Sequence, residues 1–376
     1  MLSKLHWLVP VVLGAFVLSL TCEPIQRSLI YLHWAKWPLP ILAHFATPTF
    51  YGFAPGKVQH LYLDTNDGAR LGAWLVLAEE AYDRAIRDDQ LSLEGHLPSA
   101  VFESALRSPS YPTVLYFHGN AGSRAVGNRI RVAQKLSASN CNVLMIDYRG
   151  FADSSSSPPP TEQGMLIDAT RAFDYLHLEH KVDPAQIVVM GQSLGTGIGT
   201  ALVASLVDRG IHLRSLVLIA PFSSIAALLE TYKLGQVIPL VSPLRRFPWL
   251  FNQLLSFLRS RFDTRSVISK VKCPILLVHA QDDPVIPFSH SRTLSEHLLE
   301  PLLHESEPER TENDHEPRGR QVVVEEQVVG GWGTVKRFER GQGFGRVVWA
   351  EAKTGGHTFI GETEYVMRLV DETIRG

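Results

Sequence analysis

From residue 113 onward, short runs of β-branched and aliphatic residues alternate with longer segments whose apolar residues recur at helical spacing. The predicted strands are 113–117, 142–146, 186–190, 213–219 and 273–279, and the predicted helices are 124–136, 163–177, 195–207 and 289–299. Short apolar runs of this kind are typical of strands buried on both faces, and each helix supplies the crossover that parallel strands need. The chain is therefore predicted to be an α/β protein with a mainly parallel sheet and helices on both faces.

Two segments before residue 113, residues 60–77 and 79–110, do not follow this alternation of strands and helices. Residues 60–77 contain two strand-like runs around Asn66-Asp67-Gly68, and Asn-Gly or Asp-Gly pairs readily adopt the positive φ angles of a tight turn. These residues are predicted to form an antiparallel hairpin. Residues 79–110 are polar and mixed in charge, which predicts an insertion at the surface.

Two more insertions are predicted in the second half of the chain. Residues 222–266 are rich in leucine and aromatic residues and are interrupted by prolines, which favours a helical cap, although the same residues could simply enlarge the core. A cap at this point would lie over the carboxyl ends of the strands, where ligands bind. Residues 301–345 are the other insertion, and their charged part, residues 304–320, is predicted to be a solvated loop. Residues 346–352 are the candidate for the last strand.

The N-terminus carries the longest apolar stretch. Residues 5–22 contain no Asp, Glu, Lys or Arg, and their length is close to the minimum for a helix that crosses a bilayer. An uncleaved anchor and a cleaved signal peptide both fit residues 1–22, and we favour the anchor. Residues 23–55 are aromatic and suit either a membrane interface or packing on the catalytic domain, residues 56–376. A single-pass membrane protein is therefore expected, with secretion as the alternative.

Charge and residue types argue against several functions. The 36 basic and 38 acidic residues give a net charge of −2, and no run of Lys and Arg forms the stripe that nucleic acid requires. Cys22, Cys141 and Cys273 lie far apart, which favours free thiols over a disulfide framework. The 15 histidines include no HExxH motif and no Cys/His cluster at zinc spacing. No nucleic acid partner, metal or other cofactor is predicted.

A serine with the features of a nucleophile lies between a strand and a helix. Residues 191–195 read Gly-Gln-Ser-Leu-Gly, after an apolar strand and before a helix-forming segment. A sharp turn at this point strains the serine backbone and exposes the hydroxyl, and flanking glycines let neighbouring chains approach. The five-residue pattern alone is weak, but its context makes it specific. Ser193 is predicted to be the nucleophile rather than a turn residue with a structural role.

A serine hydroxyl hardly ionises near neutral pH, so an imidazole must accept its proton and later protonate the leaving group. His357 follows the last predicted strand, which is where the chain order serine, acid, histidine places the base. The imidazole needs a buried carboxylate on its other nitrogen. Asp282 and Asp283 both follow the strand 273–279, and Asp283 is preferred because Pro284 fixes the next backbone angle.

Acyl transfer also needs hydrogen-bond donors for the oxyanion of the tetrahedral intermediate. Residues 118–122 read His-Gly-Asn-Ala-Gly and follow a predicted strand, where an α/β-hydrolase fold supplies one donor. The residue after the nucleophile supplies the other. We assign the backbone amides of Asn120 and Leu194 to this oxyanion hole, and we interpret His118 as structural. The catalytic residues of the predicted α/β-hydrolase fold are thus Ser193, Asp283 and His357.

Five motifs resemble those of a known family: His-Gly-Asn-Ala-Gly at 118–122, Asp-Tyr-Arg-Gly-Phe at 147–151, Gly-Gln-Ser-Leu-Gly at 191–195, His-Ala-Gln-Asp-Asp-Pro-Val-Ile-Pro at 279–287 and Gly-His at 356–357. They are similar to those of the membrane-anchored α/β-hydrolase lipases, which cleave monoacylglycerols and lysophosphatidylserine. The resemblance implies the same nucleophile, acid and base, a lipid-like substrate, and an anchor in an internal membrane such as the endoplasmic reticulum.

The same triad serves other chemistry, so several functions stay open. A short-chain esterase, a peptidase and an acyltransferase would all use Ser193 in the same way. A catalytically silent binding protein on this fold is a further alternative, because fold does not imply function. The expected partners are a lipid-like small molecule and a membrane that the N-terminus contacts. The sequence does not predict an oligomeric state.

Overall fold

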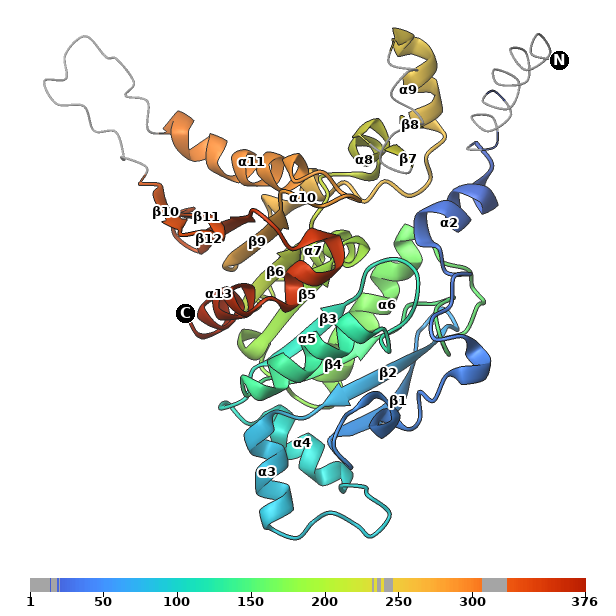
Figure 1. Cartoon of the computed structure of the whole chain (residues 1–376), viewed down its shortest axis with the longest axis vertical. Helices are drawn as coiled ribbons and strands as arrows, with labels where there is room; N and C mark the ends of the chain where they lie inside the picture. The colour runs from blue at the N-terminus through green and yellow to red at the C-terminus, as the bar shows by residue number, and fades with distance from the viewer. Residues whose placement is uncertain are drawn as a thin grey trace, which may run out of the picture.

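A computed structural model of the chain describes residues 21–231, 246–305 and 323–376, together with residues 14, 19, 233, 234, 238 and 239. The strands of its main sheet are β1 (Val58–Asp64), β2 (Arg70–Val76), β3 (Thr113–Phe117), β4 (Asn142–Ile146), β5 (Ile187–Gln192), β6 (Ser215–Ile219), β9 (Ile275–Ala280), β10 (Glu325–Val329), β11 (Gly333–Glu339) and β12 (Arg346–Ala352). They form one 10-stranded sheet in the order β1-β2-β4-β3-β5-β6-β9-β12-β11-β10 (Figure 1). Strands β4, β3, β5, β6, β9 and β12 run parallel, which confirms the predicted mainly parallel sheet.

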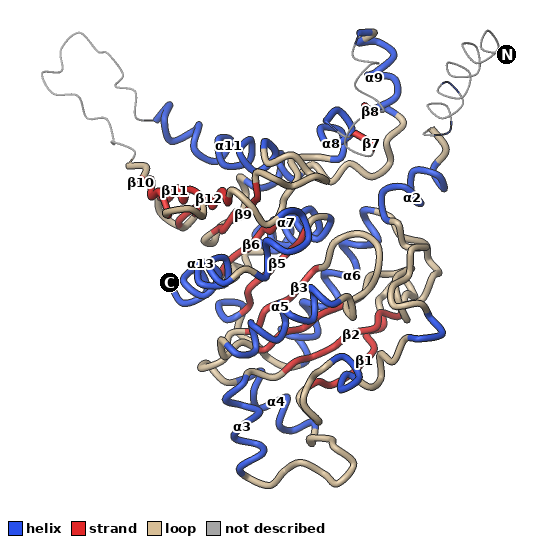
Figure 2. Tube along the Cα trace, in the orientation of Figure 1, coloured by secondary structure: helices blue, strands red, loops and turns tan. Residues whose placement is uncertain are grey.

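The longer helices are α2 (Glu23–Tyr31), α3 (Glu79–Arg87), α4 (Ser99–Arg107), α5 (Gly127–Ala138), α6 (Glu162–Asp174), α7 (Leu194–Asp208), α8 (Ile225–Thr231), α9 (Pro248–Ser256), α11 (Ser289–Glu305) and α13 (Glu364–Arg375). The shorter elements are η1 (Pro40–Leu42), η2 (Pro48–Tyr51), η3 (Tyr175–Glu179), η4 (Pro184–Gln186), β7 (Lys233–Leu234), β8 (Ile238–Pro239), α10 (Thr264–Ile268), α12 (Gly356–Phe359) and η6 (Ile360–Glu362). In Figure 2 the strands form a continuous band with helices on both sides.

Each face of the sheet has its own hydrophobic core. The side chains of β3, β4, β5, β6 and β9 are buried along their whole length, as expected for strands covered on both faces. One core packs α6, α7 and α11 against the sheet, and the other packs α5 and α13 against the opposite face. Because helices cover both faces of the sheet, a site can form in the loops at the carboxyl ends of the parallel strands.

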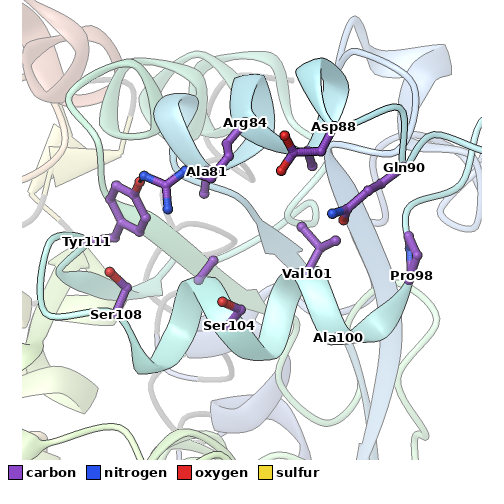
Figure 3. A pocket seen from close by; sticks show the side chains of 12 residues that line it. Ala81, Arg84, Asp88, Gln90, Pro98, Ala100, Val101, Ser104, Ser108 and Tyr111 are labelled. Atoms are coloured by element: carbon purple, nitrogen blue, oxygen red, sulfur yellow. Dashed lines mark hydrogen bonds between the residues drawn. The ribbon is translucent and has the colours of Figure 1, made fainter.

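The predicted hairpin is present at one side of the sheet. Strands β1 and β2 pair antiparallel around the turn that contains Gly68, whose φ of 88° requires glycine-like freedom. The segment 79–110 forms α3 and α4, which face each other across a pocket of about 430 Å³ (Figure 3). Arg84 and Tyr111 meet in this pocket through a hydrogen bond of 3.3 Å. This pocket contains none of the candidate catalytic residues.

The segment 301–345 contributes strands that we did not predict as a pair. Strands β10 and β11 extend the sheet antiparallel beyond β12. Exposed side chains on β10 give the sequence little apolar alternation, which explains why the pattern was weak. The candidate last strand, residues 346–352, is β12. Of the predicted solvated loop 304–320, residues 306–320 lie outside the described residues.

The structure describes only part of the predicted cap, residues 222–266, and of the apolar N-terminal stretch, residues 5–22. Within 222–266, the structure contains α8, α9 and α10, with the short pair β7 and β8 between α8 and α9. Most of residues 5–22 lie outside the described residues, and among those described, no helix is both long and apolar enough to span a bilayer. After α2, residues 32–55 are irregular apart from the short helices η1 and η2, and they run along the catalytic domain.

Candidate active site

Ser193 lies at the turn between β5 and α7, as the local sequence predicts. Its φ of 53° is a strained value for a residue with a side chain, and its amide donates to the Ile219 carbonyl across 3.0 Å. The turn depends on both flanking glycines. A Cβ atom on Gly191 would lie 2.3 Å from the Gly195 carbonyl oxygen, and one on Gly195 would lie 2.0 Å from the Phe117 carbonyl oxygen.

The structure brings Ser193, His357 and Asp283 together from three distant parts of the chain. The Ser193 hydroxyl donates to His357 Nε2 across 2.9 Å, and His357 Nδ1 donates to Asp283 Oδ2 across 2.8 Å. His357 follows β12, as predicted, and lies on the one-turn helix α12. Both distances allow a proton to pass from the hydroxyl to an imidazole whose tautomer is fixed by the carboxylate.

Asp283 is held as a carboxylate by four hydrogen bonds. Its Oδ1 accepts the amides of Val285 and Ile286 at 2.8 and 2.9 Å, and its Oδ2 accepts His357 and His279 at 2.8 and 3.1 Å. Burial alone would raise the pKa of Asp283, but the hydrogen bonds from His279 and His357 lower it well below its usual value. The group therefore stays ionised and accepts a hydrogen bond from His357 throughout the neutral range.

Gln192, which we did not predict, and Asp282, which we weighed only as the alternative acid, hold the His357 segment in place. Gln192 Nε2 donates to the carbonyls of His357 and Thr358, each across 3.2 Å, and its Oε1 accepts the Tyr116 hydroxyl. Asp282 accepts the amide of Gly356 across 2.8 Å. Gln192 and Asp282 are each adjacent in sequence to a predicted triad residue. Their hydrogen-bond partners in the His357 segment are backbone atoms more than 70 positions away, so no local sequence pattern indicates these contacts.

The loop 118–122 lies against Ser193. A Cβ atom on Gly119 would lie 3.2 Å from the Ser193 Cβ, so glycine permits this close approach. The buried Arg129 guanidinium donates to the carbonyls of Gly119, Asn120, Ala121 and Ser123, at distances between 2.8 and 3.3 Å. Arg129 was missed by the sequence analysis because its acceptors are backbone atoms.

The Gly119 carbonyl, which Arg129 binds across 3.3 Å and which lies 2.6 Å from His118 Nδ1, sets the direction of the Asn120 amide. In a trans peptide the carbonyl of one residue and the N–H of the next point in opposite directions, so the Asn120 N–H points away from Arg129. The amides of Ala121 and Gly122 are bound by the carbonyls of Tyr31 and Ala35, but within the described residues no backbone carbonyl binds that of Asn120. Leu194 is the first residue of α7, so its amide has no helical partner. Both predicted donors are therefore free to bind an oxyanion.

A cavity of about 400 Å³ opens at Ser193. Its lining includes Ser193 and His357, the loop 119–122, and two residues of the N-terminal segment, Ala35 and Trp37. Of the described residues that line this cavity, none belongs to 222–266, where we expected the cap to cover the site. Among the described residues, Ala35 and Trp37 of the N-terminal segment form one wall of the cavity.

The other predicted motif residues have structural contacts. His118 is buried, its Nε2 lies 3.0 Å from Asp147, and burial lowers its pKa. Asp147 also binds the buried Arg124, and Arg149 binds Asp168. Within the described residues, no group of three or more His, Cys, Asp or Glu is arranged to hold a metal ion.

Comparison with known proteins agrees with this architecture. Residues 112–244 match the family model described as the alpha/beta hydrolase fold. An alpha-beta hydrolase from Vibrio vulnificus superposes with a TM-score of 0.53 at 16% identity, over 73% of this chain and 81% of that one. The Pyrococcus furiosus esterase Pf2001 superposes with a TM-score of 0.51 at 15% identity, over 88% and 95% of the two chains. The fold is that of an α/β hydrolase.

Two sequence relatives narrow this class. A protein of Danio rerio named lysophosphatidylserine lipase ABHD12 is 30% identical over 77% of this chain and 70% of its own length. The human protein ABHD12B is 28% identical over 73% of this chain and 69% of its own length. The chain belongs to the α/β-hydrolase family and, within it, is related to ABHD12 and ABHD12B.

Proposed function

We propose that this protein is a serine hydrolase that cleaves carboxylic esters of lipids, such as monoacylglycerols or lysophospholipids, through an acyl-enzyme on Ser193. The observation that carries the proposal is the hydrogen-bonded series Ser193 Oγ, His357 Nε2, His357 Nδ1 and Asp283 Oδ2, with distances of 2.9 and 2.8 Å. This is the geometry in which an imidazole can activate a hydroxyl at neutral pH.

The proposed reaction has two halves. As Ser193 Oγ attacks the ester carbonyl carbon, its proton passes to His357 Nε2, and the amides of Asn120 and Leu194 stabilise the oxyanion. The imidazolium then protonates the leaving alcohol, which departs and leaves the acyl group on Ser193. In the second half, His357 takes a proton from water, the resulting hydroxide oxygen attacks the acyl carbon, and Ser193 Oγ recovers its proton from His357.

Two observations support the lipid part of the proposal. A relative at 30% identity bears the name lysophosphatidylserine lipase. In addition, Trp37 lines the cavity at Ser193, so an apolar ring is available beside an acyl chain. The triad itself is equally suited to short-chain esters, peptides or acyl transfer, and these become the outcomes of the test below.

The location of the protein belongs to the same proposal. Residues 5–22 would anchor the chain as a single-pass membrane protein, with the endoplasmic reticulum as the proposed membrane and secretion as the alternative. An epitope tag at each end, combined with protease protection of isolated microsomes, tests this topology. Extraction of the protein by alkaline carbonate would contradict the anchor.

The substrate is tested with purified wild-type protein and Ser193→Ala on matched series of monoacylglycerols, lysophospholipids, short-chain esters and peptides. We expect hydrolysis of long-chain lipid monoesters that the variant lacks. Preference for acyl chains of two to four carbons, with no gain when substrate is presented in micelles, would replace the proposal with a short-chain esterase. Cleavage of peptides alone would replace it with a peptidase, and acyl transfer to an alcohol in preference to water would replace it with an acyltransferase.

A further inference from the structure

Acidic residues are absent from two long segments of this chain. Residues 24–63 and 231–262 contain no Asp or Glu, although the whole chain has 38 acidic and 36 basic residues. The basic residues of the two segments are Arg27, Lys36, Lys57, Lys233, Arg245, Arg246, Arg259 and Arg261. Arg27 and Lys57 form salt bridges with Glu23 and Glu79, so among the described residues the positive charge of these segments that has no acidic partner lies on Lys36, Arg246, Arg259 and Arg261.

The fold brings described parts of both segments together. Gln26 on α2 donates to the Phe257 carbonyl across 2.9 Å and accepts the Arg259 amide across 3.0 Å, just after α9. The hydroxyls of Tyr31 and Ser260 are 2.6 Å apart. Helices α2 and α9 lie on the same side of the molecule, far from α3 and α4 (Figure 1). The described residues 24–42 and 246–262 thus form one connected surface, which we call the basic aromatic surface.

Large apolar side chains are exposed on the basic aromatic surface. Trp34 is 65% exposed, Ile41 is 88% exposed and Trp249 on α9 is 72% exposed, and Leu42 and Phe247 are also exposed. Arg246, Arg259 and Arg261 are exposed on the same segment as Trp249. Exposed apolar groups gathered with cations mark an interaction site for an apolar and anionic partner.

We propose that the basic aromatic surface docks on the face of an anionic lipid bilayer and turns the mouth of the Ser193 cavity toward the lipid. Tryptophan rings and Arg or Lys side chains together suit the headgroup region, where one side is apolar and the other carries phosphate. The apolar residues 5–22 lead directly into α2, so an anchor there would bring this surface to the membrane. A second copy of the chain would meet it with like charge.

The basic aromatic surface is hydrogen-bonded to the loop that follows β3 and lies against Ser193. The carbonyls of Tyr31 and Ala35 accept the amides of Ala121 and Gly122 at 3.2 and 2.8 Å, and the Trp37 carbonyl accepts the Ser123 hydroxyl at 2.8 Å. Trp37 also lines the cavity that contains Ser193. The part of the inference that concerns lipid delivery rests on the proposed function, whereas docking itself does not.

Fluorescent labels at two positions of the full chain test the docking. Ile41→Cys and Leu93→Cys are made in a Cys22→Ser background, since Cys141 and Cys273 are buried. Leu93 is fully exposed in the loop between α3 and α4 and serves as the matched control. Both proteins carry a bimane label and are reconstituted in vesicles of phosphatidylcholine, with or without phosphatidylserine. Quenching is measured with brominated acyl chains and with aqueous iodide.

We expect brominated lipid to quench the label at position 41 at least several-fold more than the label at position 93, and iodide to show the opposite order. The difference should increase with phosphatidylserine and decrease in Arg246→Glu/Arg259→Glu. Equal iodide quenching at both positions would overturn the docking, and protection of position 41 from both quenchers would replace the bilayer with a second copy of the chain. Because quenching needs no turnover, a protein that docks but hydrolyses no lipid would overturn only the proposed function.

Discussion

Asp282 and Asp283 are adjacent in sequence but bind different groups in the candidate site. Asp283 accepts His357 Nδ1, whereas Asp282 accepts the backbone amide of Gly356. We predict that Asp283→Asn lowers kcat/KM by about 10⁴, because the amide no longer fixes the required tautomer of the histidine. Asp282→Asn keeps one acceptor oxygen and should cost little, whereas Asp282→Ala should cost about tenfold. Ester hydrolysis by the three purified variants measures this order.

The ranking of the two aspartates is what decides their assignment. A larger loss in Asp282→Asn than in Asp283→Asn would exchange their roles. Circular dichroism of each variant provides the control, because a loss of activity that accompanies unfolding carries no information about the triad.

Arg129 provides a second prediction at this scale. Lysine cannot reach the several carbonyls that the guanidinium binds, so Arg129→Lys should loosen the loop 119–123 and misdirect the Asn120 amide, although His118 Nδ1 still contacts the Gly119 carbonyl. We expect kcat to fall by about 10² while KM changes little, because the lost interaction forms only with the oxyanion. Steady-state kinetics on a soluble ester provides both constants.

Arg340 offers a matched control for this substitution. It is also buried, and it also donates to backbone carbonyls, those of Cys273, Phe344 and Gly345, but none of these belongs to the site. Arg340→Lys should lower Tm without lowering kcat. If both variants lose kcat in proportion to their loss of stability, Arg129 has only a structural role.

The residues with a local sequence signal were the ones that could be predicted. Ser193 has a strand before it, a helix after it and glycines on both sides, and His357 follows the last strand. Gln192 and Asp282 act through backbone atoms that are distant in sequence, and Arg129 acts through the carbonyls of the loop 119–123, so their roles depend on the folded chain. No pattern of residue types could have identified them.

At the scale of elements, α11 is joined to both ends of α8 through a buried histidine. His290 Nδ1 lies 3.0 Å from the Ser223 hydroxyl, and Nε2 lies 3.1 Å from the Thr231 hydroxyl. Burial lowers the pKa of His290 to about 4, and nearby His279 adds to this while Asp283 opposes it. The unfolded chain binds a proton at this residue below pH ~6.5 and the folded chain does not until about pH 4. Stability should therefore fall as the pH decreases through this window.

We predict that His290→Gln removes about 2 kcal/mol from the difference in unfolding free energy between pH 7 and pH 5. Urea unfolding of both proteins at the two pH values measures that difference. A lost contact would lower stability equally at both pH values, so only the change with pH reports on the titration. An unchanged pH dependence in the variant would contradict the low pKa.

Elements with strong apolar periodicity were predicted accurately. The predicted strands 113–117, 142–146 and 346–352 have the observed bounds of β3, β4 and β12. The pair β10 and β11 was not predicted, because the side chains of β10 are largely exposed and its sequence shows little alternation of apolar and polar residues. The wall that Trp37 and Ala35 contribute to the cavity was also missed, since the aromatic pattern of residues 23–55 suited both a membrane interface and packing on the catalytic domain.

For the whole molecule, burial predicts a gradient of local stability across the sheet. The central strands β3, β5 and β6 are covered on both faces, whereas the edge strand β10 is largely exposed. We predict that hydrogen exchange measured by mass spectrometry is slowest in peptides from β3, β5 and β6 and fastest, among the strands, in β10. Exchange in β10 as slow as in β5 would show that another surface covers this edge.

The central claim is that His357 activates Ser193 as the nucleophile of this α/β hydrolase. Its most direct measurement is peptide mapping by mass spectrometry after reaction with a fluorophosphonate, on wild type and on His357→Ala. We predict an adduct on Ser193 in the wild type and a rate of labelling at least about 10³-fold lower in the variant, because the hydroxyl loses its base. An adduct on a different residue, or equal labelling rates in the two proteins, would contradict the claim.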